Sequence, residues 1–240
     1  MDVQFNKMKP VKSYQHVVDE IQTAICDGNI KEGDKLPSEM KLKEMFDTSR
    51  GTIREALRVL EQKGLLSVTT GVKGGARVQS ANTKPMTDSV AILIRQQKVS
   101  LHHLAEFRKM MEGHISEQAA KLADENDIQQ LTHILDTAAA HISTKPSGWK
   151  TFHEMDARFH RTLALIAQNP LLEANLTAVH DNIQIYFHQY LPWSQDLLND
   201  NFKDLCDIVE AIKQKLPLTA RKIAEKHVSK FNDLMEKRLK

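Results

Sequence analysis

Two helical patterns and a pair of strand-like segments dominate the first 80 residues of this 240-residue chain. Apolar residues recur at helical spacing over residues 13–26 and again over residues 49–63, where Gly64 provides a stop. Between them, Ser38 is of the type that caps the start of a helix, here a short one. This order of elements leaves few folds open to the first third of the chain.

The strand-like segments predict a hairpin with a basic tip. Residues 65–70 and 76–79 have the composition of strands, and the glycine-rich segment 71–75 between them carries Lys73. Three helices followed by such a hairpin form a winged helix-turn-helix, whose third helix enters the major groove of DNA. The sequence therefore predicts a DNA-binding domain over residues 1–80.

The rest of the chain is expected to be helical. A polar linker is predicted over residues 81–85, and about seven helical segments follow from residue 86 to residue 240. Glycine and proline are scarce, at 9 and 7 residues, and aromatic residues make up only 5%, which favours helices over strands. We predict a mainly α protein whose second domain is an antiparallel helical bundle.

Charge and cysteine content limit the partners and the location. The formal net charge is only +2, so any affinity for DNA has to come from the placement of basic residues. Cys26 and Cys206 form neither a metal-binding spacing nor a disulfide framework. Because we find no signal pattern and no apolar run of membrane-spanning length, we expect a cytoplasmic protein without a membrane partner.

The start of the third helix contains the side chains expected to read bases. Arg50, Thr52 and Arg54 lie off the apolar stripe. An arginine there can bind guanine O6 and N7, a contact that discriminates between bases by about 1–3 kcal/mol. Taken alone, these arginines and Arg58 would more often belong to a solvent-exposed helix face with no ligand. The hairpin that follows the helix makes DNA binding the favoured interpretation.

A family resemblance extends this interpretation. Leu36-Pro37-Ser38-Glu39, the segment SRGTIREALRVLE at residues 49–61, and Gly64-Leu65 resemble the GntR family of transcription regulators over roughly residues 11–79. Met40 departs from the family, which usually has an arginine there, and this suggests a weaker grip or a shifted operator preference. The resemblance and the position of the hairpin tip give the expected DNA-binding set, which is Ser38, Ser49, Arg50, Thr52, Arg54, Gly71 and Lys73.

The second half resembles the helical ligand-binding domain of the FadR subfamily, called the FCD type. The resemblance rests on residues 106–112, on DARFH at 156–160 with NPLL at 169–172, and on residues 208–212 with the last helix through His227. It implies a domain that binds a small effector and forms a homodimer.

A divalent metal is predicted in this domain. Asp156 and His160 are four residues apart and share a helix face, which suits zinc, nickel or manganese. The resemblance adds His227 and implies a further histidine, but Leu205 stands in that position. Three alternatives follow for the incomplete ligand set. Water or an effector carboxylate completes the coordination shell, or another histidine takes the fourth position. In the third alternative the metal is absent, and Asp156 and His160 are a buried polar pair. The candidate substitutes are His153, His180 and His188.

Arg108 and Glu112 are the expected effector contacts. They lie one turn apart on an otherwise apolar helix, and a buried arginine favours a carboxylate ligand. In the subfamily the matching arginine often faces the effector. An internal ion pair between the two residues is the alternative.

These observations predict a homodimeric transcription regulator, a repressor, whose affinity for palindromic operator DNA is set by a small organic or sugar acid. One alternative is a metal-free sensor of the acyl-CoA type. A second is a histidine-rich helical metalloenzyme with a DNA-binding appendage, and a third is an architectural DNA-binding protein without an effector. We do not expect an enzyme, because the chain shows no nucleophile–base pair, no phosphate-binding loop and no zinc-protease helix.

Overall fold

The computed structural model describes residues 13–69, 71, 74–80, 83–142, 146–190 and 194–239. The side chains of residues 13, 146–148, 184–190 and 236–239 lie outside this description. The chain divides into two compact units, Met1–Pro85 and Met86–Lys240, and each unit is considered by itself.

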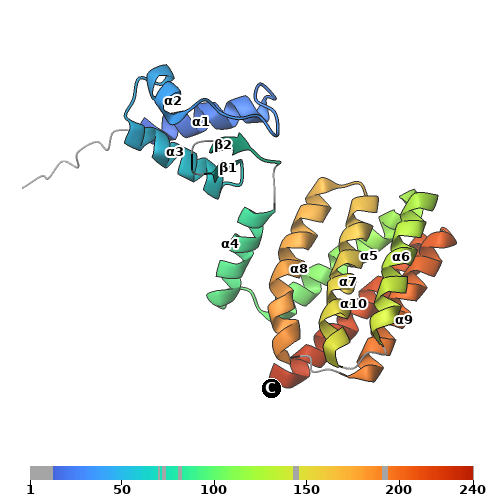
Figure 1. Cartoon of the computed structure of the whole chain (residues 1–240). Coiled ribbons are helices and arrows are strands. Elements are labelled where there is room, and N and C mark those ends of the chain that lie inside the picture. Colours follow the sequence, from blue (N-terminus) through green and yellow to red (C-terminus); the bar gives the residue numbers. More distant parts are fainter. Residues whose placement is uncertain are drawn as a thin grey trace, which may run out of the picture. The chain divides into compact units, whose positions relative to one another are not determined.

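The first unit has the predicted order of elements. It contains helices α1 (Ser13–Cys26), α2 (Glu39–Met45) and α3 (Arg50–Gln62), followed by strands β1 (Leu66–Thr69) and β2 (Gly75–Val78) (Figure 1). The strands pair antiparallel and form the hairpin of a winged helix-turn-helix. The mainly α fold class is confirmed.

Two serines define where the short helices of this unit begin. Ser38 Oγ accepts a hydrogen bond from the Lys41 backbone N–H at 3.3 Å and caps α2. Ser49 Oγ accepts from the Thr52 backbone N–H at 3.1 Å and caps α3. Each cap satisfies one of the backbone donors that a helix start leaves without a partner.

The segment that leads into α2 is attached to the hairpin. The Leu36 backbone N–H donates to the Ala76 carbonyl, and the Val78 N–H donates to the Asp34 carbonyl, both at 2.9 Å. The apolar side chains of these elements form one core, made of Val17, Val18, Ile21, Leu36, Leu42, Ile53, Ala56, Leu57, Leu60, Leu66, Ala76 and Val78. The start of α2 is therefore fixed to the base of the hairpin by both backbone and side chains.

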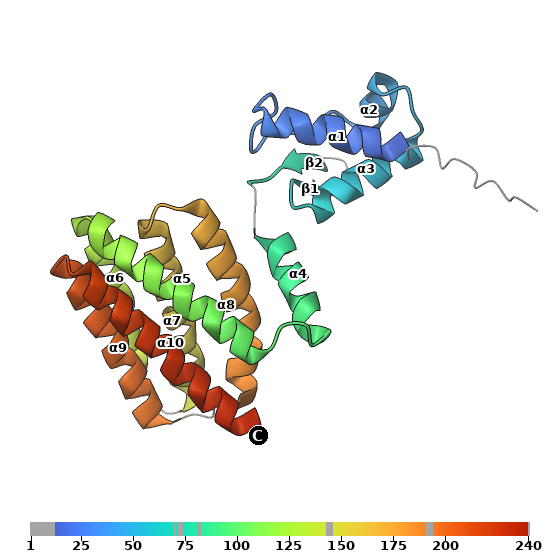
Figure 2. The same cartoon turned by 180° about the vertical axis from the view of Figure 1, so that it is seen from behind.

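The second unit is a bundle of long helices, as predicted. Its helices are α4 (Lys84–Arg95), α5 (Leu101–Leu122), α6 (Glu125–Ile142), α7 (Pro146–Ile166), α8 (Pro170–Tyr190), α9 (Gln195–Lys213) and α10 (Pro217–Leu239). Helices α5 and α10 run along each other (Figure 2). No helix in the described part of the chain is both long and apolar enough to cross a bilayer.

Two details of the bundle bear on the predictions. Helix α4 begins at Lys84, so the last two residues of the predicted linker belong to a helix, and Pro85 lies in the first turn, where proline is favoured. Gly113 lets α5 approach α10 closely, because a Cβ there would lie 2.6 Å from Glu225 Cγ.

The core of the first unit predicts the effect of shortening one side chain of α3. Leu60 is completely buried, so Leu60→Ala removes apolar contacts and leaves a cavity. We expect the free energy of unfolding of the first unit to fall by about 2–5 kcal/mol, measured by urea denaturation. Arg58→Ala, on the exposed face of the same helix, is the control and should change it by less than about 0.5 kcal/mol.

Candidate DNA-reading surface and buried histidine cluster

One glutamate holds the two arginines expected to read bases. Arg54 Nε donates to Glu39 Oε2 at 2.9 Å, and Arg50 Nη2 lies 3.6 Å from the same oxygen. The side chains of Arg54 and Arg50 are 62% and 56% exposed, so both remain open to a ligand. The structure thus brings the starts of α2 and α3 together through Glu39, a residue that sequence reasoning used only as part of a motif.

Other members of the expected DNA-binding set that the structure describes lie at the starts of α2 and α3 or between the two strands. The Ser49 and Thr52 hydroxyls are 2.9 Å apart. Gly71 adopts a φ of +106°, which a residue with a side chain rarely adopts, and Gly74 N–H donates to its carbonyl at 2.9 Å. Lys73 lies outside the described residues.

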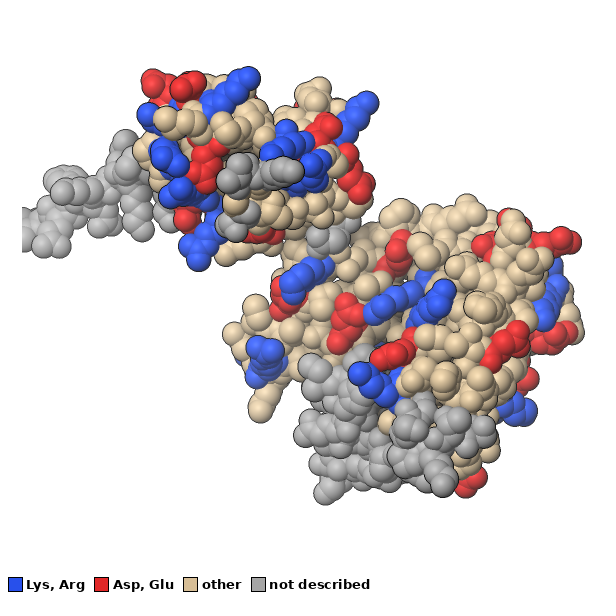
Figure 3. All heavy atoms as spheres, in the orientation of Figure 1, with Lys and Arg blue, Asp and Glu red and all other residues tan. Residues whose placement is uncertain are grey.

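Basic and acidic side chains are mixed on the surface. Figure 3 shows lysine and arginine interspersed with aspartate and glutamate on the visible face of each unit. This mixture of charges agrees with a net charge of only +2. Affinity for DNA would then depend on individual side-chain contacts more than on overall charge.

Arg54 gives a direct test of the DNA-reading surface. Arg54→Ala should lower affinity for the operator and relax discrimination at one base step by about 1–3 kcal/mol, because it removes a guanidinium able to bind guanine. Fluorescence anisotropy with the operator and single-base variants measures both effects. Arg95→Ala, an exposed arginine of α4, is the control, and equal behaviour of the two variants would contradict the assignment of α3.

A charged cluster lies inside the helical bundle. Its members are almost completely buried and come from four helices, namely Arg108 and Glu112 (α5), Asp156 and His160 (α7), His180 (α8) and His227 (α10). Ionisable side chains are rarely buried unless they are paired or bind an ion.

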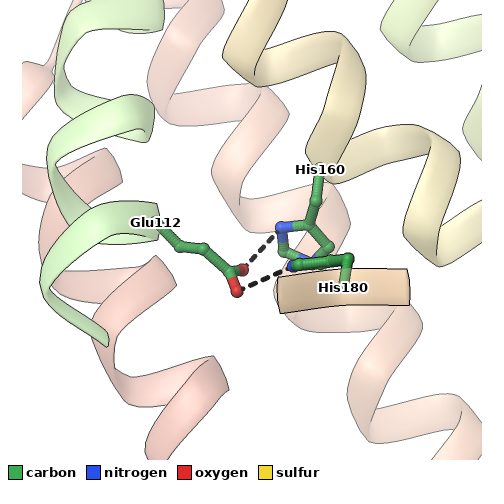
Figure 4. A group of neighbouring side chains, drawn as sticks. All are labelled: Glu112, His160 and His180. Atoms are coloured by element: carbon green, nitrogen blue, oxygen red, sulfur yellow. Dashed lines mark hydrogen bonds and ion pairs between the residues drawn. The ribbon is translucent and has the colours of Figure 1, made fainter. Parts of the chain in front are cut away.

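Glu112 is the centre of one half of this cluster. Its Oε1 accepts from Arg108 Nε at 2.6 Å and contacts His180 Nε2 at 3.0 Å, while its Oε2 lies 2.8 Å from His160 Nδ1. Figure 4 shows the carboxylate facing both imidazoles, with a dashed line to each. The ion pair that the sequence left as an alternative for Arg108 and Glu112 is thus present, and Glu112 contacts two histidines that its sequence position does not indicate.

The charges of the cluster follow from these contacts. Burial raises the pKa of the Glu112 carboxyl, but Arg108 and the two histidines outweigh burial and hold that pKa well below its usual range. Burial opposes ionisation of Asp156 too, yet the nearby histidines, led by His160, lower its pKa. Burial lowers the pKa of His180, whereas Glu112 outweighs burial at His160 and raises its pKa. Glu112 and Asp156 are therefore carboxylates at neutral pH.

The other half of the cluster is the metal-binding set expected from sequence. Asp156, His160 and His227 each offer a donor atom, and these atoms all lie within 4.8 Å of one another. Asp156 Oδ1 and His160 Nε2 are 3.8 Å apart, and neither has a hydrogen-bond partner among the described residues. Buried polar atoms without partners are unusual. Two imidazoles and a carboxylate that converge in this way fit a divalent transition metal.

The remaining positions raised by the sequence lie elsewhere. Leu205 is buried in the apolar core, so it supplies no fourth ligand. His153 packs edge-on against Trp149, with ring centroids 4.3 Å apart, and belongs to neither donor group found among the described residues. His180 joins Glu112 and His160 in a second donor group, and the His188 side chain lies outside the description.

Comparison with known families agrees with this architecture. Residues 103–230 match the FCD domain, and residues 13–78 match the bacterial regulatory proteins of the gntR family. The chain belongs to the GntR family and carries an FCD domain. The predicted membership and the FadR-type subfamily are confirmed.

The similarity to named relatives and to a solved structure covers most of the chain. The transcriptional repressor NanR of Enterobacter sp. is 26% identical over 89% of this chain and 81% of its own length. The Glc operon transcriptional activator of Escherichia coli K12 is 27% identical over 88% of this chain and 84% of its own. The structure of a GntR protein from Streptococcus agalactiae has a TM-score of 0.73 and 24% identity, and covers 92% of this chain and 99% of that one, which supports the fold.

The buried ion pair of this GntR protein predicts a strong coupling between two substitutions. Glu112→Ala removes the carboxylate that Arg108 Nε contacts at 2.6 Å and should lower the free energy of unfolding by about 3–5 kcal/mol. The double variant Arg108→Met/Glu112→Leu removes both charges and should cost less than the single one, measured by urea denaturation of the metal-free protein. A double variant that is destabilised as much as Glu112→Ala, or more, would contradict a buried pair.

Proposed function

We propose that this GntR regulator is a homodimeric repressor released from operator DNA by a small acid bearing one carboxylate, with a divalent metal held by Asp156, His160 and His227. The observation that supports this most is the buried convergence of the three side chains, with Asp156 Oδ1 and His160 Nε2 lacking hydrogen-bond partners. When bound, the metal supplies a Lewis-acidic positive centre that accepts a carboxylate oxygen.

The three ligands leave the coordination shell incomplete. Structural zinc sites use four protein ligands, whereas sites that bind an exchangeable molecule use three. Leu205 occupies the place of the fourth, so a water or an effector oxygen is needed to complete the shell. This feature favours an exchangeable ligand over a purely structural ion.

The charge of the cluster favours one carboxylate. Among the almost completely buried side chains, Glu112 and Asp156 contribute two negative charges and Arg108 contributes one positive charge. The more exposed Asp204 beside His227 is balanced by Lys230. With neutral histidine ligands and a divalent metal, the sum is a single positive charge. One carboxylate neutralises it, whereas a second would stay buried without a counterion.

A symmetric dimer follows from the size of the DNA-reading unit. One winged helix-turn-helix buries too little DNA surface for tight, specific binding, and two recognition helices about one helical turn apart read a palindrome. The effector changes operator affinity only by its different affinity for the two states of the dimer, typically about 5–150-fold. The named relatives include a repressor and an activator, and we favour repression with release.

The metal test compares two donor groups that share His160. Zinc, nickel and manganese are titrated into the metal-free full-length chain, with bound metal measured by elemental analysis. Asp156→Asn should abolish stoichiometric binding, and His180→Gln, which alters only the group around Glu112, should retain it. The reverse result would move the metal to Glu112, His160 and His180. No binding by the wild type would refute the metal and leave the acyl-CoA type of sensor.

The effector test uses the metal-loaded protein and its operator. A panel of small monocarboxylates and dicarboxylates is added during an anisotropy titration. A monocarboxylate should lower operator affinity by about 5–150-fold in the wild type and not in Asp156→Asn. Tighter operator binding would make the protein an activator or a co-repressed regulator, and an equal response to dicarboxylates would contradict the charge argument.

A further inference from the structure

Two carboxylates contact the Nδ1 atoms of the two histidines in the proposed metal site. Glu112 Oε2 is in ion-pair contact with His160 Nδ1 at 2.8 Å, and Asp204 Oδ2 is in hydrogen-bond contact with His227 Nδ1 at 3.4 Å. Asp204 is on α9, next to the leucine that replaces the expected ligand. Neither carboxylate belongs to the Asp156 donor group.

These contacts bear on which nitrogen of each ring carries the proton. A neutral imidazole has one N–H and one lone pair, and the hydrogen bond made by one nitrogen sets the state of the other. A carboxylate beside Nδ1 accepts a hydrogen bond from Nδ1–H, and the lone pair of the neutral ring is then on Nε2. For His160, Nε2 is the atom that faces Asp156 Oδ1 at 3.8 Å.

His227 is held in a similar way by Asp204 of α9. Its ring stacks on His160, with centroids 5.4 Å apart and planes 29° apart, and also packs against Phe231 at 5.1 Å. Lys230 Nζ lies 2.8 Å from Asp200 Oδ2 and 3.9 Å from Asp204 Oδ2, so Asp204 itself has a cationic neighbour. Asp204 Oδ2 lies 3.4 Å from His227 Nδ1, and a carboxylate oxygen there can accept a hydrogen bond from the ring.

The geometry points to Glu112 and Asp204 as paired positioning residues, which fix both histidines as Nδ1–H tautomers and direct their Nε2 lone pairs at one metal beside Asp156. Two rings held in this way compensate for the ligand lost at Leu205, because three prearranged donors lose less entropy on binding than three mobile ones. This role rests on the proposed metal site. It also reassigns Glu112, which we had expected to touch the effector.

The tautomers of His160 and His227 are measured first, on the metal-free full-length protein. Long-range 1H–15N correlation spectra at mildly alkaline pH distinguish the two neutral forms, and His160→Gln and His227→Gln assign the signals. Both rings should be protonated at Nδ1 in the wild type. Protonation at Nε2 in either ring would overturn the positioning role.

Zinc affinity is measured next, by competition with a chelator. Asp204→Asn should bind zinc about 10–100-fold more weakly than the wild type, and its His227 signal should shift away from the Nδ1–H form. Asp207→Asn is the matched control, because Asp207 is on the same helix, is half exposed and contacts Lys203 instead of a histidine. Equal zinc affinity of the two variants would overturn the role of Asp204.

Glu112 is tested in parallel with Glu112→Gln and the control Glu117→Gln, which changes a glutamate on the same helix that pairs with Lys121 and Arg221. Only Glu112→Gln should alter the His160 tautomer signal and weaken zinc. If Glu112→Gln does not fold, the wild-type His160 spectrum and the Asp204 pair still decide the proposal. A wild type that binds no zinc refutes the proposed function and, with it, the metal-positioning role, even where the tautomers are as expected.

Discussion

The contact between Glu112 and Arg108 is the interaction on which the interior of the bundle depends. Both side chains are almost completely buried and lie 2.6 Å apart. Removing two charges from water costs several kcal/mol per ion, and an apolar pair of the same volume is often as stable. The pair is therefore poorly explained by stability alone. Its other effect is to place a carboxylate, with a fixed orientation and a fixed charge, against two histidines of neighbouring helices.

The two units position their polar groups by different kinds of contact. In the first, backbone hydrogen bonds attach the segment before α2 to the hairpin, and serine caps define where α2 and α3 begin. In the second, side chains from several helices meet in a cluster of charges. Both arrangements place polar groups by contacts with residues far away in the sequence. Each leaves a few groups, the two exposed arginines or the buried Asp156–His160 pair, available to a ligand.

Local patterns explain why much of this could be predicted from the sequence. The spacing of apolar residues gave α1 its observed bounds, and residue types alone located the Ser38 cap and the hairpin. Asp156 and His160 were recognisable because four residues on a helix bring two side chains to one face. The contacts of Glu112 and Asp204 had no such signal, since their histidine partners lie on other helices. Asp204 precedes Leu205 in the sequence, but neither its residue type nor its spacing indicates a contact with His227.

The position of Glu39 has a consequence for how the free protein meets DNA. Its carboxylate is an internal counterion for Arg50 and Arg54, at 3.6 and 2.9 Å, and removes roughly one positive charge from the surface proposed to face DNA. Loose attraction to phosphates depends on such charge and falls with salt as counterions are exchanged. A guanine edge and a phosphate both have to displace this carboxylate to bind the guanidinium. On the proposed DNA-reading surface, Glu39 therefore reduces the non-specific, salt-dependent part of DNA affinity.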